Sequence, residues 1–387
     1  MEMYAYYSII FFSAVILSLY LYILSAKIMD IFSNKRRKKS SKQLLPYVDE
    51  LIKNIVDGKK VSEVTIENLK KSMENKVKRE IIVEHIMYYF EIFKGDFMDD
   101  LIDICEKTGI VDYEIKNLKN KNIYKKALAC KRLGDIRSRK SITPLLAEVN
   151  IMDNDVKYNV LLALAKIGDE EAFIGAFERI NTAVLLSERS LIEIVDSFEG
   201  NKRHIYEHMI NSKNDFIASV FIKSAGNFKD IFLSEEISKF LLDKDKEKRI
   251  SAIKALGNMV DIRYLEKIIE LLEDPEWEVR AIAAKSLGRF EDDRILIPLA
   301  KALSDKQWHV RYNAASSILS APEGLDIVYY VFEGEDRFAK DIIASAIENS
   351  GYLRKIHEYE FSEDEHKKRI AELIRNYIEE NTKGEKI

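Results

Sequence analysis

Residues 271–288 read LLEDPEWEVRAIAAKSLG, and this stretch decides the fold. Two related stretches flank it: LLDKDKEKRISAIKALG at residues 241–257 and ALSDKQWHVRYNAASSIL at residues 302–319. In each of them apolar residues recur with the spacing of an α-helix. Self-similarity at a fixed period is the signature of a repeat array, so we expect a stack of similar helical units.

The copies keep a step of 31 residues. The positions that keep this step are Asp243, Asp274 and Asp305; Arg249, Arg280 and Arg311; Gly226, Gly257 and Gly288; and the only two tryptophans, Trp277 and Trp308. Weaker copies begin near Tyr124. Because one helix pair leaves an apolar face uncovered, stacking on the next pair buries that face and the array grows along one axis.

Each repeated position has an expected structural role. We expect the aspartates at helix N-caps, where a carboxylate accepts hydrogen bonds from backbone N–H groups. Pro275 is then expected at the first helical position, where its missing N–H is not needed. Small residues such as Ala283 and Ala314 should let neighbouring helices approach closely, and the glycines should end helices in a left-handed conformation.

The unit, with its core D-x-x-W-x-V-R-x-x-A-A-x-x-L-G, resembles the HEAT repeats of the bacterial type that is also found in phycobilin-lyase-like proteins. The resemblance is strong over residues 240–321, fair over residues 124–168 and absent before about residue 120. It implies two antiparallel helices in each unit, with the signature helix lining the concave face. It also implies a ladder between successive repeats, formed by Asp243, Asp274, Asp305, Arg249, Arg280 and Arg311.

A separate feature is the uncharged run YAYYSIIFFSAVILSLYLYILSA, which covers 23 residues from Tyr4 to Ala26. As a helix it would be about 35 Å long, enough to cross a hydrocarbon core of about 30 Å. Tyrosines lie near both of its ends, as is usual at the headgroup level. A cleaved signal peptide is the alternative, but the residues before this run include Glu2 and no Lys or Arg.

The basic residues that follow the run set its expected orientation. They are Lys35, Arg36, Arg37, Lys38, Lys39 and Lys42. By the positive-inside rule, the N-terminus lies outside and the C-terminal domain is cytoplasmic. Residues 1–42 carry a net charge of +5, so the remainder carries −9 of a total of −4. An acidic body is a poor general surface for nucleic acid.

Composition and pattern together predict an all-α protein: an α-solenoid of HEAT/ARM-like repeats after one transmembrane helix. Only 14 Gly and 5 Pro in 387 residues favour helices joined by short loops. The expected divisions are a membrane anchor (1–30), a basic juxtamembrane linker (31–42), an irregular helical region (43–123), the HEAT-repeat solenoid (124–350) and a C-terminal capping helix with a tail (351–387).

The two tryptophans are the best candidates for a binding site. If both project from equivalent turns, they lie about 10 Å apart. Together with His309 and Tyr312 they would form a patch of the composition that is common at binding hot spots. The alternative is that both tryptophans pack between repeats, and spacing alone does not distinguish the two.

Nothing in the sequence indicates catalysis, a metal or a cofactor. His204 and His208 have a helical i, i+4 spacing, but the intervening glutamate does not give H-E-x-x-H and no third ligand is indicated. The glycine-rich phosphate loops and G-x-S-x-G are absent. Cys105 and Cys130 have no CxxC spacing, so we expect two buried, reduced thiols.

Three functions remain open at this point. The favoured one is a membrane-anchored scaffold that binds a protein partner; a membrane-embedded envelope or polysaccharide-synthesis enzyme is a candidate partner. The second is a lyase-like or other HEAT-type enzyme, which predicts a deep pocket on the concave face. The third is a nucleic-acid-binding protein, which predicts a basic stripe along the concave helices.

Overall fold

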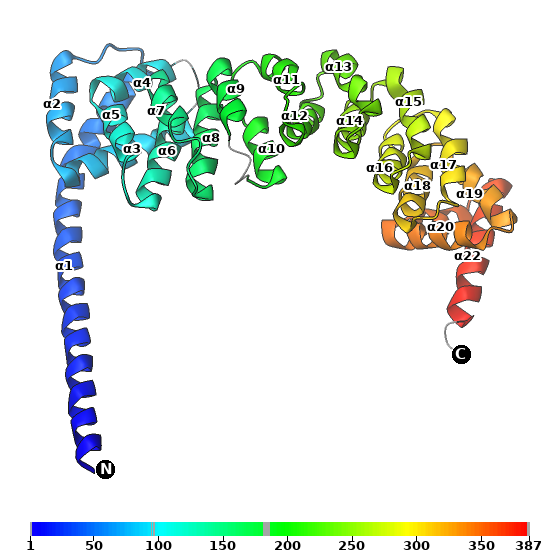
Figure 1. Ribbon diagram of the computed structural model, residues 1–387, viewed down its shortest axis with the longest axis horizontal. Coiled ribbons are helices and arrows are strands. Elements are labelled where there is room, and N and C mark those ends of the chain that lie inside the picture. The colour runs from blue at the N-terminus through cyan, green and yellow to red at the C-terminus, as the bar shows by residue number, and fades with distance from the viewer. Residues whose placement is uncertain (1, 94, 96, 181–185, 385–387) are drawn as a thin grey trace. The chain divides into compact units, whose positions relative to one another are not determined.

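The computed structural model describes residues 2–93, 95, 97–180 and 186–384, and within these ranges the chain is helical and contains no strand (Figure 1). This all-α architecture agrees with the fold class predicted from the sequence. The chain divides into two compact units, Met1–Ala172 and Phe173–Ile387. The division falls inside the expected repeat region, at the start of α9 (Glu170–Arg179).

The first unit is built around the C-terminal end of one very long helix. Its helices are α1 (Glu2–Val56), α2 (Glu63–Met73), α3 (Lys76–Ile92), α4 (Met98–Lys107), α5 (Ile110–Asn117), α6 (Ile123–Ile136), α7 (Ile142–Leu146) and α8 (Asn154–Ile167). Val48, Leu51, Ile52 and Ile55 of α1 are buried, and α1 packs on α3 at this end. Both cysteines, Cys105 and Cys130, are buried free thiols.

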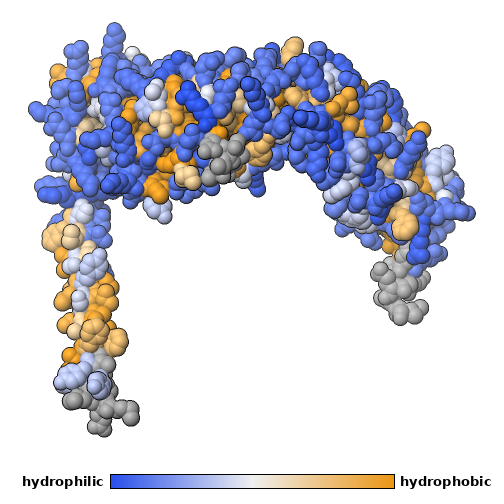
Figure 2. Space-filling view, in the orientation of Figure 1, coloured by the Kyte–Doolittle hydropathy of each residue, from blue (hydrophilic) through white to orange (hydrophobic). Residues whose placement is uncertain are grey.

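Helix α1 has no break where a linker was expected. Residues 31–42 are helical and continue directly into the buried end of α1. These residues are rich in lysine and arginine, which are good helix formers, and contain neither glycine nor proline. Figure 2 shows that the exposed length of α1 is largely apolar at its surface. The basic residues therefore lie on a helical stalk that joins the apolar segment to the first unit.

The second unit alternates short and long helices. They are α10 (Glu188–Asp196), α11 (Lys202–Met209), α12 (Asp215–Phe228), α13 (Ser234–Ser238), α14 (Lys246–Met259), α15 (Leu265–Glu270), α16 (Trp277–Leu287), α17 (Leu296–Ala302), α18 (Trp308–Ser320), α19 (Gly324–Glu333), α20 (Arg337–Ser350), α21 (Leu353–Glu360) and α22 (Glu365–Gly384). The long helices α12, α14, α16, α18 and α20 pack on one another in sequence, and each follows a short helix. This is the stacking expected of a solenoid.

The repeated glycines do not end the helices in a left-handed conformation, as the sequence had suggested. After the last turn of α14, the residue in the left-handed conformation is Val260, whose φ is 54°. The glycines instead allow close packing: a Cβ atom built on Gly226 would lie 2.5 Å from Cα of Ala255, and one on Gly257 would lie 2.7 Å from Cβ of Ser286. Glycine is therefore required at these positions because the next long helix lies against its backbone.

Candidate functional site

The signature aspartates lie before the helices rather than at their N-caps. Asp274 is followed by two further residues before α16 begins at Trp277, so the expectations for Asp274 and Pro275 were both wrong by two positions. The carboxylate of Asp274 accepts a hydrogen bond from the backbone N–H of Glu276 at 2.9 Å, and Asp243 and Asp305 make the equivalent bond. This Asx turn leaves the other side of each carboxylate available to a second partner.

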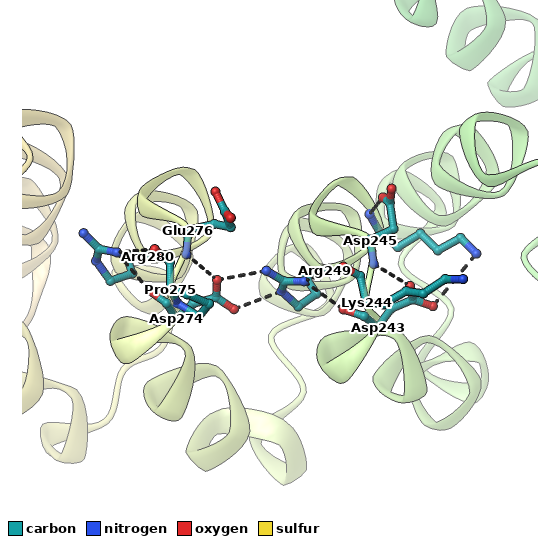
Figure 3. A network of polar contacts seen from close by, with 9 residues as sticks. Asp243, Lys244, Asp245, Arg249, Asp274, Pro275, Glu276 and Arg280 are labelled. Atoms are coloured by element: carbon teal, nitrogen blue, oxygen red, sulfur yellow. Dashed lines mark hydrogen bonds and ion pairs between the residues drawn. The ribbon is translucent and has the colours of Figure 1, made fainter.

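For Asp274 and Asp305 the second partner is an arginine of the preceding repeat, as Figure 3 shows for Asp274. Nε and Nη2 of Arg249 donate to the two oxygens of Asp274 at 2.9 and 3.0 Å, and Nη1 donates to the backbone oxygen of Asp243 at 2.8 Å. Arg249 is 9 % exposed and Asp274 is 8 % exposed. A bidentate, charge-assisted pair of this kind fixes the distance and orientation between α14 and α16.

The same geometry recurs one repeat later. Arg280 donates to the two carboxylate oxygens of Asp305 at 2.7 and 3.0 Å, and to the backbone oxygen of Asp274 at 2.8 Å. Burial alone would raise the pKa of Asp305, but the hydrogen bonds from Arg280 and from the N–H of Gln307 outweigh it, so this pKa lies below its ordinary value. The pair therefore remains ionised at neutral pH.

The ladder ends at Arg311. Its Nη1 still donates to the backbone oxygen of Asp305 at 2.8 Å, but within the described ranges Nε has no hydrogen-bond acceptor. Asp336 stands 31 residues after Asp305, yet it is the N-cap of α20 and accepts a hydrogen bond from Ser304 at 2.7 Å. Because Asp336 directly precedes its helix, its carboxylate faces the backbone N–H groups of α20 instead of the arginine.

The four aromatic candidates come together at the N-terminal ends of α16 and α18. The ring of His309 lies between the two tryptophans, with its centroid 5.2 Å from that of Trp277 and 5.2 Å from that of Trp308. Tyr312 stacks on Trp308 at 4.9 Å with an interplanar angle of 16°. Trp308 is 48 % exposed, and Trp277 and Tyr312 are half-buried. We call Trp277, Trp308, His309 and Tyr312 the aromatic patch.

This arrangement decides the question that spacing left open for Trp308. Its indole is on the surface and stacks on side chains of its own helix, while Trp277 supports it through the ring of His309. Stacked rings lose little conformational entropy on binding because they are already held in place. The patch therefore offers a large, rigid and partly apolar surface to a partner.

The remaining candidates stay apart from the patch. Nε2 of His208 lies 3.1 Å from a carboxylate oxygen of Glu178. Among the residues that the structure describes, no three His, Cys, Asp or Glu side chains are grouped so that they could hold a metal ion. In the basic cluster of α1, Arg37 forms an ion pair with Glu84 of α3.

A row of lysines was not predicted from the sequence. Lys223, Lys254 and Lys285 keep the same 31-residue step as the ladder and lie on α12, α14 and α16. Each precedes by three residues one of the tightly packed glycines. The step was visible in the sequence, but lysine is common on helix surfaces, so only the partial burial of Lys223 and Lys254 distinguishes the row from a solvated face.

Comparison with known proteins identifies the repeats. Residues 265–321 match the family of HEAT repeats, and residues 248–274 match the PBS lyase HEAT-like repeat. No curated protein matches the chain. Together the two matches cover residues 248–321, which carry the aromatic patch and every ladder residue except Asp243.

Two solved structures that the chain matches are distant from it. An engineered protein of a structural genomics consortium is 18 % identical, with 81 % of this chain and 98 % of that chain covered and a TM-score of 0.34. The complex of CpcE and CpcF of phycocyanin lyase from Nostoc is 16 % identical, with 69 % and 94 % covered and a TM-score of 0.28. The chain is thus an all-helical protein that contains HEAT repeats, of the PBS lyase HEAT-like type over residues 248–274.

Proposed function

We propose that this protein is a membrane-anchored scaffold whose HEAT repeats hold a protein partner on the cytoplasmic side. The observation that carries the proposal is the aromatic patch, which lies within the matched HEAT repeats and whose Trp308 is 48 % exposed. Clusters of tryptophan and tyrosine at a surface are typical of binding hot spots. HEAT-type solenoids present extended surfaces of this kind to partners.

The anchor is supported by the length and exposure of α1. This helix is long and apolar enough to cross a membrane, and none of its apolar window is buried in the molecule. Large side chains such as Ile16 and Tyr22 are 66 % and 71 % exposed. Twenty or so exposed apolar residues on one helix are unfavourable in water and favourable in a bilayer.

The stalk gives the anchor a mechanical consequence. Between Ala26, the last residue of the apolar run, and Val48, the first buried residue, α1 continues for 22 residues, or about 33 Å. A helix of this length does not fold back as a flexible linker does. The first unit is therefore held at a set distance from the apolar segment of α1, close to the membrane, which suits a partner that is itself embedded in the membrane.

The anchor gives a direct prediction. The full-length protein is expected to sediment with membranes and to stay there in alkaline carbonate, because a spanning helix is held by apolar burial and not by charge. Deleting residues 2–26 should move the protein to the soluble fraction. Release of the intact protein by carbonate would contradict a spanning helix and leave only a peripheral association through Lys35–Lys42.

The aromatic patch gives a second prediction. A photoreactive amino acid placed at Ser316, on the helix that carries Trp308, is expected to give a reproducible covalent adduct with a membrane-associated protein. Trp308→Ala should weaken this adduct by roughly thirtyfold, the equivalent of about 2 kcal/mol for a hot-spot residue. Because Trp308 is half exposed, its loss should not unfold the repeat, which circular dichroism of the variant will check.

Tyr330→Ala provides the matched control. Tyr330 lies on α19 in the same unit, is 69 % exposed and is not part of the aromatic patch. Its substitution should leave the adduct unchanged. An adduct that neither Trp277→Ala nor Trp308→Ala affects, or the absence of any adduct, would overturn the proposed site.

A further inference from the structure

The lysine row occupies one equivalent place on three successive helices. Gly226, Gly257 and Gly288 each lie against the next long helix, so the residues three positions before them lie about 60° around the helix from equivalent contact points. Lys223, Lys254 and Lys285 are those residues. Because α12, α14 and α16 pack directly on one another, the three lysines succeed each other at about the helix-packing distance, roughly 10 Å.

Lys254, the central member of the row, makes no ion pair with a described residue. It is half-buried, and burial lowers the pKa of its ammonium group, with a further lowering from the neighbouring Lys223. Glu188 and Glu247 act on this pKa in the opposite direction, but within the described part of the chain the ammonium makes no ion pair or hydrogen bond. A partly desolvated cation without an acceptor is stabilised when a ligand supplies a carboxylate.

The other two lysines do not remove this need. Lys223 pairs with Glu188, which lies on α10, and this leaves the carboxylate unavailable to Lys254. Lys285 is exposed to solvent. Along the axis of the repeats, the row therefore contains a neutralised cation at Lys223, an unpaired cation at Lys254 and a freely accessible cation at Lys285.

Polar residues border the row on the side toward the C-terminal ends of the helices. One turn after each lysine come Asn227, Asn258 and Arg289, which again keep the 31-residue step. Their amides and guanidinium can hydrogen-bond to the backbone or carboxylates of an extended segment. On the opposite side lie Glu247 and Glu278, so the basic strip is narrow.

The row leads to the aromatic patch. The next long helix after α16 is α18, where Ser316 takes the place of the lysine. One turn before Ser316 on the same helix lies Tyr312, which stacks on Trp308. A ligand that follows the lysines in order therefore arrives beside the patch after one more repeat.

We propose that the lysine row binds an extended acidic segment of the partner, with carboxylates at every third residue and an aromatic residue at the end that reaches the aromatic patch. In the extended polyproline II conformation a chain advances about 3.1 Å per residue with three residues per turn, so every third side chain lies on one face and recurs after about 9 Å, close to one repeat of roughly 10 Å. The inference rests on the proposed scaffold function, since it specifies the chemistry of the segment that the scaffold holds.

The charges around the row favour a peptide over a nucleic acid. A nucleic-acid backbone carries a charge on every nucleotide and takes up a broad basic surface. Here the carboxylate of Glu247 acts on the ammonium of Lys254 from the border of the strip and would repel such a backbone, while Glu278 is already paired with Lys246. Carboxylates spaced along a peptide contact the lysines and avoid these two glutamates.

The test uses the full-length protein in nanodiscs of zwitterionic lipid, which do not compete for cations. The probe is a fluorescein-labelled peptide with three glutamates at every third residue and a phenylalanine three residues beyond the last, made in both chain directions. Binding is followed by fluorescence anisotropy. We expect one direction to bind, to weaken as salt is raised, and to bind at least tenfold more tightly than a peptide of equal composition with its glutamates adjacent.

Variants locate the binding on the row. Lys254→Glu and Lys285→Glu should each weaken binding of the spaced peptide by about tenfold or more, because each replaces an attraction with a repulsion. Lys267→Glu is the matched control: Lys267 is an exposed lysine on α15, outside the row, and its reversal should change nothing. Lys285 is solvent-exposed, so its variant tests the row even if the Lys254 variant does not fold.

Peptide binding that Lys285→Glu leaves unchanged, or no binding in either direction, would overturn the inference. A single-stranded oligonucleotide that displaces the peptide from the wild type and fails to bind Lys285→Glu would show that the row binds a nucleic acid and not an acidic peptide. The adduct at Ser316 separates this failure from failure of the scaffold. If a Trp308-dependent adduct forms while the acidic peptide does not bind, the scaffold function is supported and the acidic segment is ruled out. If the peptide binds but no adduct forms, the lysine row is an acidic-peptide site and the proposed scaffold site is overturned.

Discussion

Asp274→Ala is expected to lower the free energy of unfolding of the second unit by about 3–5 kcal/mol, the largest loss among the single substitutions considered for this protein. The substitution leaves the guanidinium of Arg249, which is 9 % exposed, without its bidentate partner. It also removes the acceptor for the N–H of Glu276, which opens the turn before α16. Thermal unfolding of the full-length protein in detergent, followed by circular dichroism, will measure the loss.

An exposed pair of the same chemistry is the control. Asp292 accepts hydrogen bonds from Arg294, which hold the pKa of Asp292 at about 2, but the pair is open to solvent. Asp292→Ala should therefore cost less, about 1 kcal/mol, because water replaces the ion-pair partner and only the N-cap hydrogen bond from the backbone N–H of Arg294 is lost. Combining Asp274→Ala with Arg249→Met should recover part of the stability by removing the unpaired charge. Equal effects of Asp274→Ala and Asp292→Ala would show that the ladder does not hold the repeats together.

Gly226→Ala is expected to destabilise the second unit by about 1–3 kcal/mol, although alanine is the better helix former by up to about 1 kcal/mol. The added Cβ atom would lie 2.5 Å from Cα and 2.9 Å from Cβ of Ala255. Since the first of these is a backbone atom, α12 and α14 must move apart, and the packing on both sides of them loosens. The same thermal unfolding measurement will show whether Gly226→Ala is less stable than the wild type.

Gly175→Ala is the matched control for this effect. Gly175 is also inside a helix, α9, but an added Cβ atom there meets no heavy atom within 4 Å. Helix propensity should then act alone and raise stability by up to about 1 kcal/mol. If both alanine variants were more stable than the wild type, the close approach at Gly226 would not be a requirement of the fold.

The repeat architecture could be predicted because the 31-residue step is a property of the chain itself. Units that stack in a row must place the same residue types at the same interfaces, so Asp243, Asp274 and Asp305 recur together with Arg249, Arg280 and Arg311. The identity of the positions was therefore visible in the sequence. The same reasoning could have drawn attention to the lysine row.

The physical roles of these positions could not be predicted in the same way. A glycine near the end of a helical pattern is compatible with a left-handed stop or with close helix packing, and only the distance from Gly226 to Ala255 distinguishes them. An aspartate before a helix is compatible with an N-cap or with an Asx turn two residues earlier. The choice at Asp274 depends on where Arg249 of the neighbouring repeat lies.

The sequence by itself determined that this protein is helical, that its repeats follow a fixed step, and that its first helix is apolar along a length that could span a bilayer. Helical periodicity and apolar run length are local properties, and they need no knowledge of neighbours in space. The tertiary structure decided that Trp308 is exposed, that Asp336 does not extend the ladder, and that α1 continues unbroken into the first unit. Exposure and pairing depend on which helix packs against which, and that is settled only when all the interfaces form together.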